Sequence, residues 1–255
     1  MRTLPCPNKI QISRQLDISY GKYPATGTNI NFIFVCFTNR CGSNYLCDLL
    51  ASTSQFNRAQ ECLNADVVLD MCRLREIRSL SRYVYDAAHE NVQNGNFIIK
   101  VAAEQLAMLV ECGFLDDVLD RSLFVWIQRS DKLAQAISLS IAEQNQQWAW
   151  YVPTEVPDEA LVFSAERIAE HIFWITAQNL AFDHFFAVNA LKPVPILYES
   201  LVDHREVILR QFFHAAGQLE LPMDISLLEL KRQAREINCR WREAFLQEYG
   251  AIGCL

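Results

Sequence analysis

The sequence predicts a single α/β domain in which a parallel sheet of about four or five strands is flanked by helices. Four short apolar segments, at residues 31–37, 97–101, 123–128 and 194–198, have the composition of buried strands. Segments with helical periodicity separate them, and this alternation is typical of a doubly wound parallel sheet. Hydrophobic residues make up 51% of the chain and charged residues 21%, so the chain can bury a sizeable core.

Each apolar segment is expected to form a strand that is covered on both faces. The segments are NFIFVCF, FIIKV, LFVWIQ and VPILY, which are rich in β-branched or aromatic residues and lack strict alternation. Each runs into, or ends at, polar residues. In open α/β sheets ligands bind outside the carboxyl ends of the strands, so these ends are the first candidates for a site. Strand ends are polar in any such fold, however, so position alone does not establish a function.

Helices are expected between and after the strands. The longest begins at Ser164, which can cap it, and carries Glu166 in its first turn and apolar residues at helical spacing from Ile168 onward. Residues 1–30 are polar with scattered Pro and Gly, and are expected to form an irregular lead-in to an α/β domain of residues 31–255. The expected helical segments are residues 44–53, 64–90, 103–120, 131–148, 164–190, 203–217 and 225–249.

Composition argues against several classes of protein. The net charge of −7 lacks the basic surplus of a general nucleic-acid binder. No apolar run approaches the ~20 residues that span a bilayer, and no secretory signal is evident at the start. The nine cysteines include no Cys-x-x-Cys pair, which favours free thiols in a reducing cytoplasm. The five histidines show no metal-ligand spacing, so no metal is expected.

The segment TNRCGSNYL, residues 38–46, has the pattern of an anion-binding loop. It joins the first expected strand to a helix through a turn at Gly42, which directs backbone N–H groups and the helix dipole toward one point. Arg40 adds a planar, positively charged guanidinium group, and the side chains of Ser43 and Asn44 add hydrogen-bond donors. The segment lacks Gly-x-x-x-x-Gly-Lys-Ser/Thr, so a metal-free phosphate or phosphosulfate fits better than a magnesium nucleotide. An ordinary strand–turn–helix junction remains the alternative.

Further candidates lie elsewhere along the chain, each with a structural alternative. Arg129 and Ser138 can grip a second phosphate, or Arg129 is a solvated residue at a helix start. Glu61 can act as a general base toward a hydroxyl, or is a surface glutamate. Lys100 can approach a transferring group, or packs its stem on the sheet. Trp148 can line an acceptor pocket, or packs at a helix end.

Six segments, in this order, resemble the motifs of the trehalose 2-sulfotransferase family, a bacterial branch of the sulfotransferases. The opening segment is similar to a strand followed by (S/T)-P-R-S-G-S-T and a helix, and the fourth to R-R-D-K-x-A-Q-A-x-S with A-x-Q-T-x-x-W. The likeness spans roughly residues 30–245. The segments are FVCFTNRCGSNYLCDLLASTSQF, AQECLN, FIIKVAAEQL, VWIQRSDKLAQAISLSIAEQNQQW, PILYESLVDHREVILRQFFHAAG and LKRQAREINCRWREAF.

The resemblance implies the P-loop-like sulfotransferase fold, a homodimer and the donor 3′-phosphoadenosine 5′-phosphosulfate. It implies transfer of a sulfuryl group to a hydroxyl of a small acceptor, such as a carbohydrate or glycolipid, without a metal. The glutamate that the family uses as its general base matches Glu61, and Arg40 lies where it can stabilise the leaving group. Lys100 and Trp148 are candidate acceptor-binding residues from their positions in the sequence alone. The donor-binding positions are Arg40, Cys41, Gly42, Ser43, Asn44, Tyr45, Arg129 and Ser138.

The chain departs from the family pattern at the positions nearest the donor. Cys41 and Asn44 replace hydroxyl residues, Ser130 replaces a second arginine, and Cys62 follows Glu61 where the family has an aromatic residue. Two alternatives to the sulfotransferase hypothesis therefore remain at this point. One is a P-loop-like kinase, and the other is a non-catalytic descendant of the fold that binds a nucleotide or a partner protein.

Overall fold

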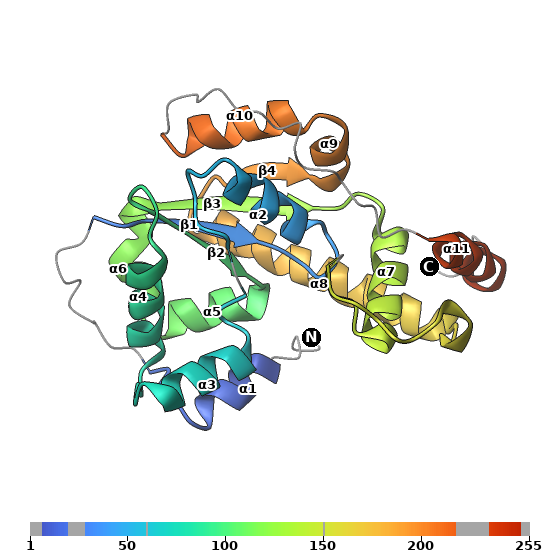
Figure 1. Cartoon of the computed structure of the whole chain (residues 1–255), viewed down its shortest axis with the longest axis horizontal. Helices are drawn as coiled ribbons and strands as arrows, with labels where there is room; N and C mark the ends of the chain where they lie inside the picture. The colour runs from blue at the N-terminus through green and yellow to red at the C-terminus, as the bar shows by residue number, and fades with distance from the viewer. Residues whose placement is uncertain (1–6, 20–28, 60, 150, 218–234, 251–255) are drawn as a thin grey trace.

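A four-stranded parallel sheet forms the centre of the computed structural model, which describes residues 7–19, 29–59, 61–149, 151–217 and 235–250 (Figure 1). The strands are β1 (Asn31–Cys36), β2 (Asn96–Val101), β3 (Ser122–Gln128) and β4 (Val194–Leu197), in the spatial order β2-β1-β3-β4. All three pairings are parallel, so the carboxyl ends of the strands meet at one edge. The predicted α/β class and the predicted strands are confirmed.

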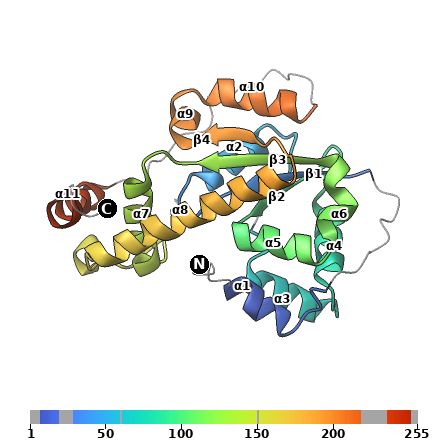
Figure 2. The ribbon, with the colours of Figure 1, turned by 180° about the vertical axis from the view of Figure 1, so that it is seen from behind.

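Helices cover both faces of this sheet, and a further group extends beyond it (Figures 1 and 2). Among the helices of the described residues, none combines the length and the apolar character needed to cross a membrane. The helices are α1 (Pro7–Ser13), α2 (Ser43–Ser52), α3 (Ala65–Leu74), α4 (Leu80–Asn91), α5 (Ala103–Glu111), α6 (Phe114–Val118), α7 (Lys132–Asn145), α8 (Ala165–Val188), α9 (Tyr198–Asp203), α10 (Arg205–Ala215) and α11 (Glu236–Tyr249), with single 3₁₀ turns at Leu119–Arg121 and Asp158–Ala160.

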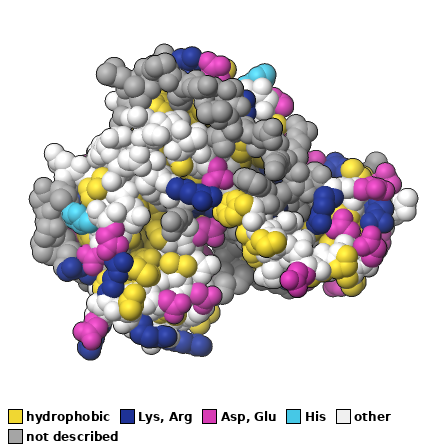
Figure 3. Space-filling view, in the orientation of Figure 1, with side chains coloured by type: hydrophobic (Ala, Val, Ile, Leu, Met, Phe, Trp, Pro, Cys, Tyr) yellow, Lys and Arg dark blue, Asp and Glu magenta, His cyan; other side chains and the backbone are white. Residues whose placement is uncertain are grey.

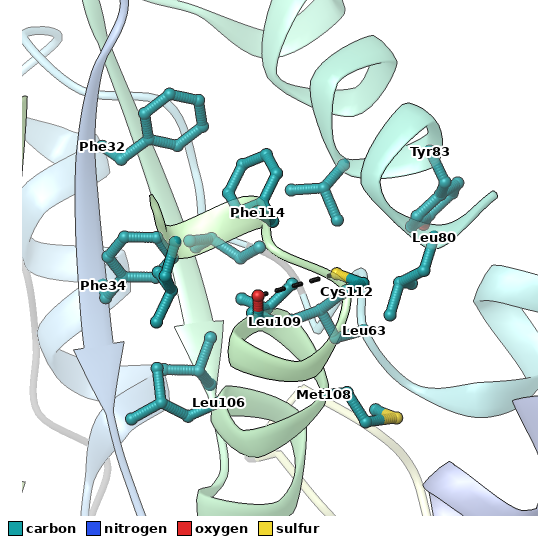
Figure 4. Close-up of a cluster of buried hydrophobic side chains, with 14 of the residues drawn as sticks. Phe32, Phe34, Leu63, Leu80, Tyr83, Leu106, Met108, Leu109, Cys112 and Phe114 are labelled. Carbon is teal, nitrogen blue, oxygen red and sulfur yellow. Dashed lines mark hydrogen bonds between the residues drawn. The ribbon is translucent and has the colours of Figure 1, made fainter. Parts of the chain in front are cut away.

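Strand β1 explains why the apolar segments lack alternation. Phe32 and Phe34 point into a core cluster with α3, α4, α5, α6 and α8, whereas Ile33 and Val35 point into a second cluster with α2 and α10. Because both faces of the sheet are buried, every position of the strand is apolar. In the first cluster the ring of Phe32 meets that of Phe114 edge to face, with centroids 5.4 Å apart (Figure 4).

Helix α8 joins this sheet to a separate group of helices. Its second half packs on the sheet, where Phe182 and Phe186 contact the ring of Trp126 in β3. Its first half forms a third apolar cluster with α7 and α11, in which Ile168 and Ile175 are buried. At 1.5 Å per residue the 24 residues of α8 extend about 36 Å, long enough to belong to both parts. In Figure 2 α8 crosses the molecule diagonally between them.

Several predicted helix boundaries were wrong, because local backbone conformations end helices at points where the apolar periodicity continues. The segment 64–90 is two helices: Glu76 adopts a positive φ of 54°, and the side chain of Ser79 then caps α4. The segment 103–120 is divided at Gly113, whose φ of 74° ends α5. The segment 203–217 belongs to α9 and α10, and α9 already begins at Tyr198, predicted as the last strand residue.

The ends of the chain also differ from the prediction. The lead-in predicted to be irregular includes helix α1, which packs against α3 and α5. The last helix, predicted over 225–249, begins at Glu236, and residues 225–234 lie outside the described residues. Ser164 caps α8 as predicted, because its side chain accepts a hydrogen bond from the amide of Arg167.

Candidate functional site

The carboxyl ends of the strands open into one cleft with a volume of about 1630 Å³. The cleft lies between the sheet and the group formed by α7, α8 and α11, and in Figure 3 the surface is indented between these two parts. The structure brings all the predicted site residues except Cys41 to this cleft. They are Arg40, Gly42, Ser43, Asn44, Tyr45, Glu61, Lys100, Arg129, Ser138 and Trp148.

The loop after β1 turns sharply before α2. Arg40 has a positive φ of 65°, unusual for a residue with a side chain, and Gly42 has a φ of 95°. A Cβ on Gly42 would lie 2.3 Å from Cδ2 of Tyr198, so only glycine lets the ring approach. Gly42 occupies the N-cap of α2 and has no side chain that could accept a hydrogen bond. The first backbone amides of α2 therefore lie at the cleft without a capping side chain.

Gln135 holds this loop in place from helix α7. Its side chain is fully buried, and its amide nitrogen donates to the hydroxyl of Thr38 at 2.8 Å and to the carbonyl of Asn39 at 2.7 Å. The sequence interpretation did not single out Gln135. The only available signal was a glutamine among the apolar positions of a helix, and such a residue is buried only when it is hydrogen-bonded.

Cys41 is the one predicted residue that does not line the cleft. Its side chain is fully buried in the cluster between the sheet and α2. Burial raises the pKa of the Cys41 thiol, although hydrogen bonds with Thr38 and Ser43 oppose this effect. The backbone N–H of Cys41 donates to the carbonyl of Thr38 at 3.2 Å. Its contribution is therefore to the packing and turn of the loop rather than to the surface of the cleft.

Arg40 reaches across the cleft from the β1 loop to helix α7. Its Nε donates to Oγ of Ser138 at 3.0 Å, and its Nη1 donates to the carbonyl of Trp148 at 2.6 Å. Burial lowers the pKa of Arg40, and the nearby positive charge of Arg129 lowers it further. Two arginines thus converge on one region of the cleft, where an anion would relieve their mutual repulsion.

Arg129 presents an unsatisfied donor to this region. Its guanidinium lies over the ring of Tyr198, with Cζ 4.9 Å from the ring centroid. Its Nε is buried and makes no hydrogen bond to the described residues. Buried donors are almost always paired in native proteins, so an unpaired one beside a second arginine indicates a place for an anionic ligand. Tyr198, which the sequence interpretation did not select, positions both Arg129 and the loop at Gly42.

Lys100 and Glu61 form an ion pair beside the first turn of α2. Nζ of Lys100 lies 2.6 Å from Oε1 of Glu61 and donates to Oδ1 of Asn44 at 2.5 Å. The ammonium also lies 4.5 Å from the ring centroid of Phe37. The Lys100 side chain is only 2% exposed, whereas that of Glu61 is 48% exposed. Lys100 therefore orients a carboxylate that remains accessible from the cleft.

The segment that carries Glu61 is fixed on its far side. The hydroxyl of Tyr83 donates to the carbonyl of Cys62 at 2.7 Å, and the side chain of Gln105 donates to the carbonyl of Leu63 at 3.0 Å. The side chain of Leu63 is buried in the core shown in Figure 4. These contacts fix the backbone next to Glu61, while Lys100 holds its side chain.

Glu199 occupies the N-terminal end of helix α7. Its carboxylate accepts hydrogen bonds from the amide of Ser130 at 3.2 Å and from that of Asp131 at 3.4 Å. Burial alone would raise the pKa of Glu199, but these and neighbouring hydrogen bonds lower it. Asp131 caps the helix by accepting a hydrogen bond from the amide of Ala134, and its carboxylate also lies 2.9 Å from Nη1 of Arg242 in α11. Because Glu199 takes up these amides and Asp131 pairs with Arg242, the side chains that remain to bind an anion here are Arg129 and Ser138.

No group of three or more His, Cys, Asp or Glu side chains with the arrangement of a metal site occurs among the described residues. All cysteines of the described part of the chain are free thiols. Burial raises the pKa of Cys47 to about 12, so this thiol stays protonated at neutral pH.

Comparison with known proteins supports one family. The family model described as Stf0 sulphotransferase matches residues 32–248. A trehalose 2-sulfotransferase from Mycobacterium tuberculosis is 28% identical over 138 residues, which are 54% of this chain and 51% of that protein. The match thus spans about half the length of the curated relative.

A solved structure is similar in fold. It is the sulfotransferase domain from the olefin synthase of Synechococcus PCC 7002, with a TM-score of 0.50 and 12% sequence identity. The similarity covers 89% of this chain and 98% of that domain. At this identity the comparison supports the fold, and the chemistry has to be argued from the cleft.

Proposed function

This chain belongs to the Stf0 sulphotransferase family, and from that premise we propose that it transfers a sulfuryl group from 3′-phosphoadenosine 5′-phosphosulfate to a hydroxyl of a small carbohydrate or glycolipid. The observation that carries the proposal is the pair of arginines, Arg40 and Arg129, at the uncapped start of α2. A donor with anionic groups at both its 5′ and 3′ positions complements two neighbouring cations.

In the proposed complex the 5′-phosphosulfate binds the loop of residues 38–43. The first amides of α2 and the guanidinium of Arg40 are its hydrogen-bond donors. The 3′-phosphate binds Arg129 and the hydroxyl of Ser138. The hydrogen bond between Arg40 and Ser138 supports this arrangement, because it makes the two anion-binding groups neighbours. The unpaired Nε of Arg129 gains a partner when the phosphate binds.

The proposed reaction is an in-line displacement at sulfur. Glu61 takes the proton of the acceptor hydroxyl, whose oxygen forms a new bond to sulfur while the bond to the bridging oxygen breaks. The electron pair of that bond remains on adenosine 3′,5′-bisphosphate, and Arg40 and the α2 amides stabilise the developing charge. Lys100 is a positioning residue in this scheme, because its ammonium holds Glu61 and is itself buried.

Binding of adenosine 3′,5′-bisphosphate, measured by calorimetry without metal, tests the proposal. We expect metal-independent binding that Arg40→Ala abolishes. Arg73→Ala is the control, because this arginine is 72% exposed on α3 and does not line the cleft. Binding that requires ATP and magnesium would favour a kinase. Failure to bind either nucleotide would overturn the enzymatic proposal and leave a non-catalytic descendant of the fold.

We further propose that the protein acts as a homodimer in a reducing, cytoplasmic environment. The family resemblance motivates the dimer, and the free thiols of the described residues suit a reducing compartment. Light scattering of the purified chain gives the mass in solution, and a monomer at micromolar concentration would contradict the first part.

A further inference from the structure

The loop after β1 contains a strained turn at residues 38–41. The amide of Cys41 donates to the carbonyl of Thr38 at 3.2 Å, which closes a β-turn. Of the two central residues, Arg40 has a φ of 65°, whereas the φ of Asn39 is not positive. This combination matches a type II turn, whose third position favours glycine or asparagine. An arginine at that position is strained, because a side chain disfavours the left-handed region.

A form of the same turn without this strain is separated from it by one rotation. Rotation of the peptide between Asn39 and Arg40 by about 180° converts a type II turn into a type I turn. The hydrogen bond between Thr38 and Cys41 persists, because both turn types contain it. The φ of Arg40 changes from 65° to about −90°, which is acceptable for a residue with a side chain. A contact outside the turn is therefore needed to hold this peptide in its strained orientation.

The contact that opposes this rotation comes from Gln135 in α7. Its Nε2 donates to the carbonyl of Asn39 at 2.7 Å and to the hydroxyl of Thr38 at 2.8 Å. A carbonyl can only accept a hydrogen bond, so the atom of Gln135 that meets it has to be the amide nitrogen. In the rotated peptide the N–H of Arg40 would replace this carbonyl, and two donors would face each other.

The orientation of the Gln135 amide is determined by the loop. Both hydrogen bonds that its nitrogen donates end on the loop, whereas its buried Oε1 has no partner among the described residues. The packing of α7 depends on the apolar side chains around it, of which Ala136, Ile137 and Leu139 belong to the third apolar cluster. Gln135 is thus placed to hold the turn rather than to build the core, and the helix should tolerate its replacement.

The orientation of this peptide decides which backbone group the loop presents to an anion. Asn39 and Arg40 line the cleft, and the side chain of Gln135 is fully buried behind them. The N–H and C=O of a trans peptide point in opposite directions, so the N–H of Arg40 points away from Gln135. There it adds to the first amides of α2 as a hydrogen-bond donor. The rotated peptide would direct a carbonyl oxygen to the same place, and its negative end repels an anion.

We propose that Gln135 is a positioning residue for the donor, which keeps the peptide between Asn39 and Arg40 in the orientation that offers an N–H to the 5′ anionic group. This inference rests on the proposed function, because that function places the 5′-phosphosulfate in this loop. Gln135 touches no reacting atom and acts only through the turn. The loop is competent to bind the donor in its type II form, and Gln135 sets the population of that form.

Nuclear magnetic resonance of the isotope-labelled full chain measures the turn directly. In a type II turn a strong nuclear Overhauser effect joins Hα of Asn39 to the amide proton of Arg40. In a type I turn it joins the amide protons of these two residues instead. We expect the first pattern in the unmodified chain and the second in Gln135→Met. Gln144→Met is the matched control, because Gln144 is an exposed glutamine of the same helix that is hydrogen-bonded to carbonyls outside the loop.

A second substitution separates strain from a general loosening of the loop. Glycine adopts the left-handed region without strain, so Arg40→Gly added to Gln135→Met should restore the type II pattern. A loop that had merely become mobile would not be restored by glycine. Gln135→Asn serves should Gln135→Met fail to fold, because its shorter side chain keeps an amide that no longer reaches the carbonyl of Asn39. The same change to the type I pattern is expected.

Calorimetry without metal measures the consequence for the donor. The strain on a side chain in the left-handed region reduces the population of that form by a factor of about 10. The affinity for a ligand that needs this form falls by the same factor. We therefore expect Gln135→Met to weaken the binding of adenosine 5′-monophosphate about 10-fold. The binding of adenosine 3′-monophosphate should not change, because Arg129 and Ser138 lie outside the turn.

Two results would overturn the inference. The first is a type II pattern, or an affinity for adenosine 5′-monophosphate, that is the same in Gln135→Met and in the unmodified chain. The second is an equal loss of affinity for both nucleotides, which would show that the substitution disturbs α7 as a whole. If neither nucleotide binds the unmodified chain, the proposed function fails, and the resonance pattern still decides whether Gln135 holds the turn.

Discussion

Replacement of Lys100 by methionine tests how the ion pair with Glu61 serves the proposed reaction. Methionine retains most of the apolar stem, which packs on the sheet, and removes the ammonium. The substitution removes the hydrogen bonds that the ammonium donates to Glu61 and Asn44, and also its contact with the ring of Phe37. Because Glu61 is 48% exposed, its carboxylate then becomes hydrated instead of remaining buried and unpaired. We therefore expect a folded variant whose carboxylate is no longer held in one orientation.

The size of the effect follows from the bond that is lost. A hydrogen bond between charged groups contributes about 1.5–3 kcal/mol, which equals a factor of about 10–150 in rate if all of it acts in the transition state. Water competes for the exposed side of Glu61, so the lower end applies, and we expect kcat to fall roughly 10- to 30-fold. Glu61→Gln removes the base itself and should cost about 10²–10⁴-fold.

A double-mutant cycle separates an indirect role of Lys100 from a direct one. If Lys100 acts only through Glu61, the double variant is as slow as Glu61→Gln alone. Affinity for adenosine 3′,5′-bisphosphate should be unchanged in Lys100→Met, and Lys100→Arg should restore part of the rate. Equal fractional losses from Lys100→Met with and without Glu61 would refute the reasoning, because they would show that the ammonium acts on the transferring group.

Two further variants test the loop and the buried histidine. Gly42→Ala should cost roughly 2–4 kcal/mol in urea unfolding, because a positive φ and a collision with Tyr198 act together. Gly95→Ala, at a φ of 75° with open space around it, should cost only about 1 kcal/mol, and equal costs would contradict the role given to Tyr198. Burial lowers the pKa of His171, so as the pH falls this histidine is protonated in the unfolded chain before it is protonated in the folded one. The free energy of unfolding therefore decreases at pH values below about 6.5. His171→Gln should reduce the loss of melting temperature between about pH 7 and about pH 5, whereas exposed His184→Gln should not.

The order of the secondary structure elements could be predicted because local composition determines it. A strand buried on both faces must be apolar throughout, and the four such segments in this chain became the four strands of the sheet. The breaks inside two predicted helices could not be recognised from periodicity. Apolar spacing continues across Glu76 and Gly113, and the positive φ angles that end the helices there depend on how each helix packs.

The candidate site could be predicted in part for the same reason. Arg40, Gly42 and Lys100 lie at strand ends, and parallel strands bring their carboxyl ends to one edge of the sheet. The contacts of Gln135 and Tyr198 with the loop could not be predicted. Neither residue type is characteristic of an anion site, and their roles arise from the packing of α7 and α9 against the loop.

The sequence by itself determined the α/β class, the place of the loop after the first strand and the charged residues at the strand ends. Only the tertiary structure decided which of them meet: Lys100 pairs with Glu61, Arg40 reaches Trp148, and Cys41 turns into the core. Strand and helix formation depend on neighbours within a few residues, so a sequence displays them directly. Lys100 and Glu61 are separated by 39 positions along the chain, and Arg40 and Trp148 by 108. Such contacts depend on the packing of the whole sheet and its helices, and no local sequence pattern records that packing.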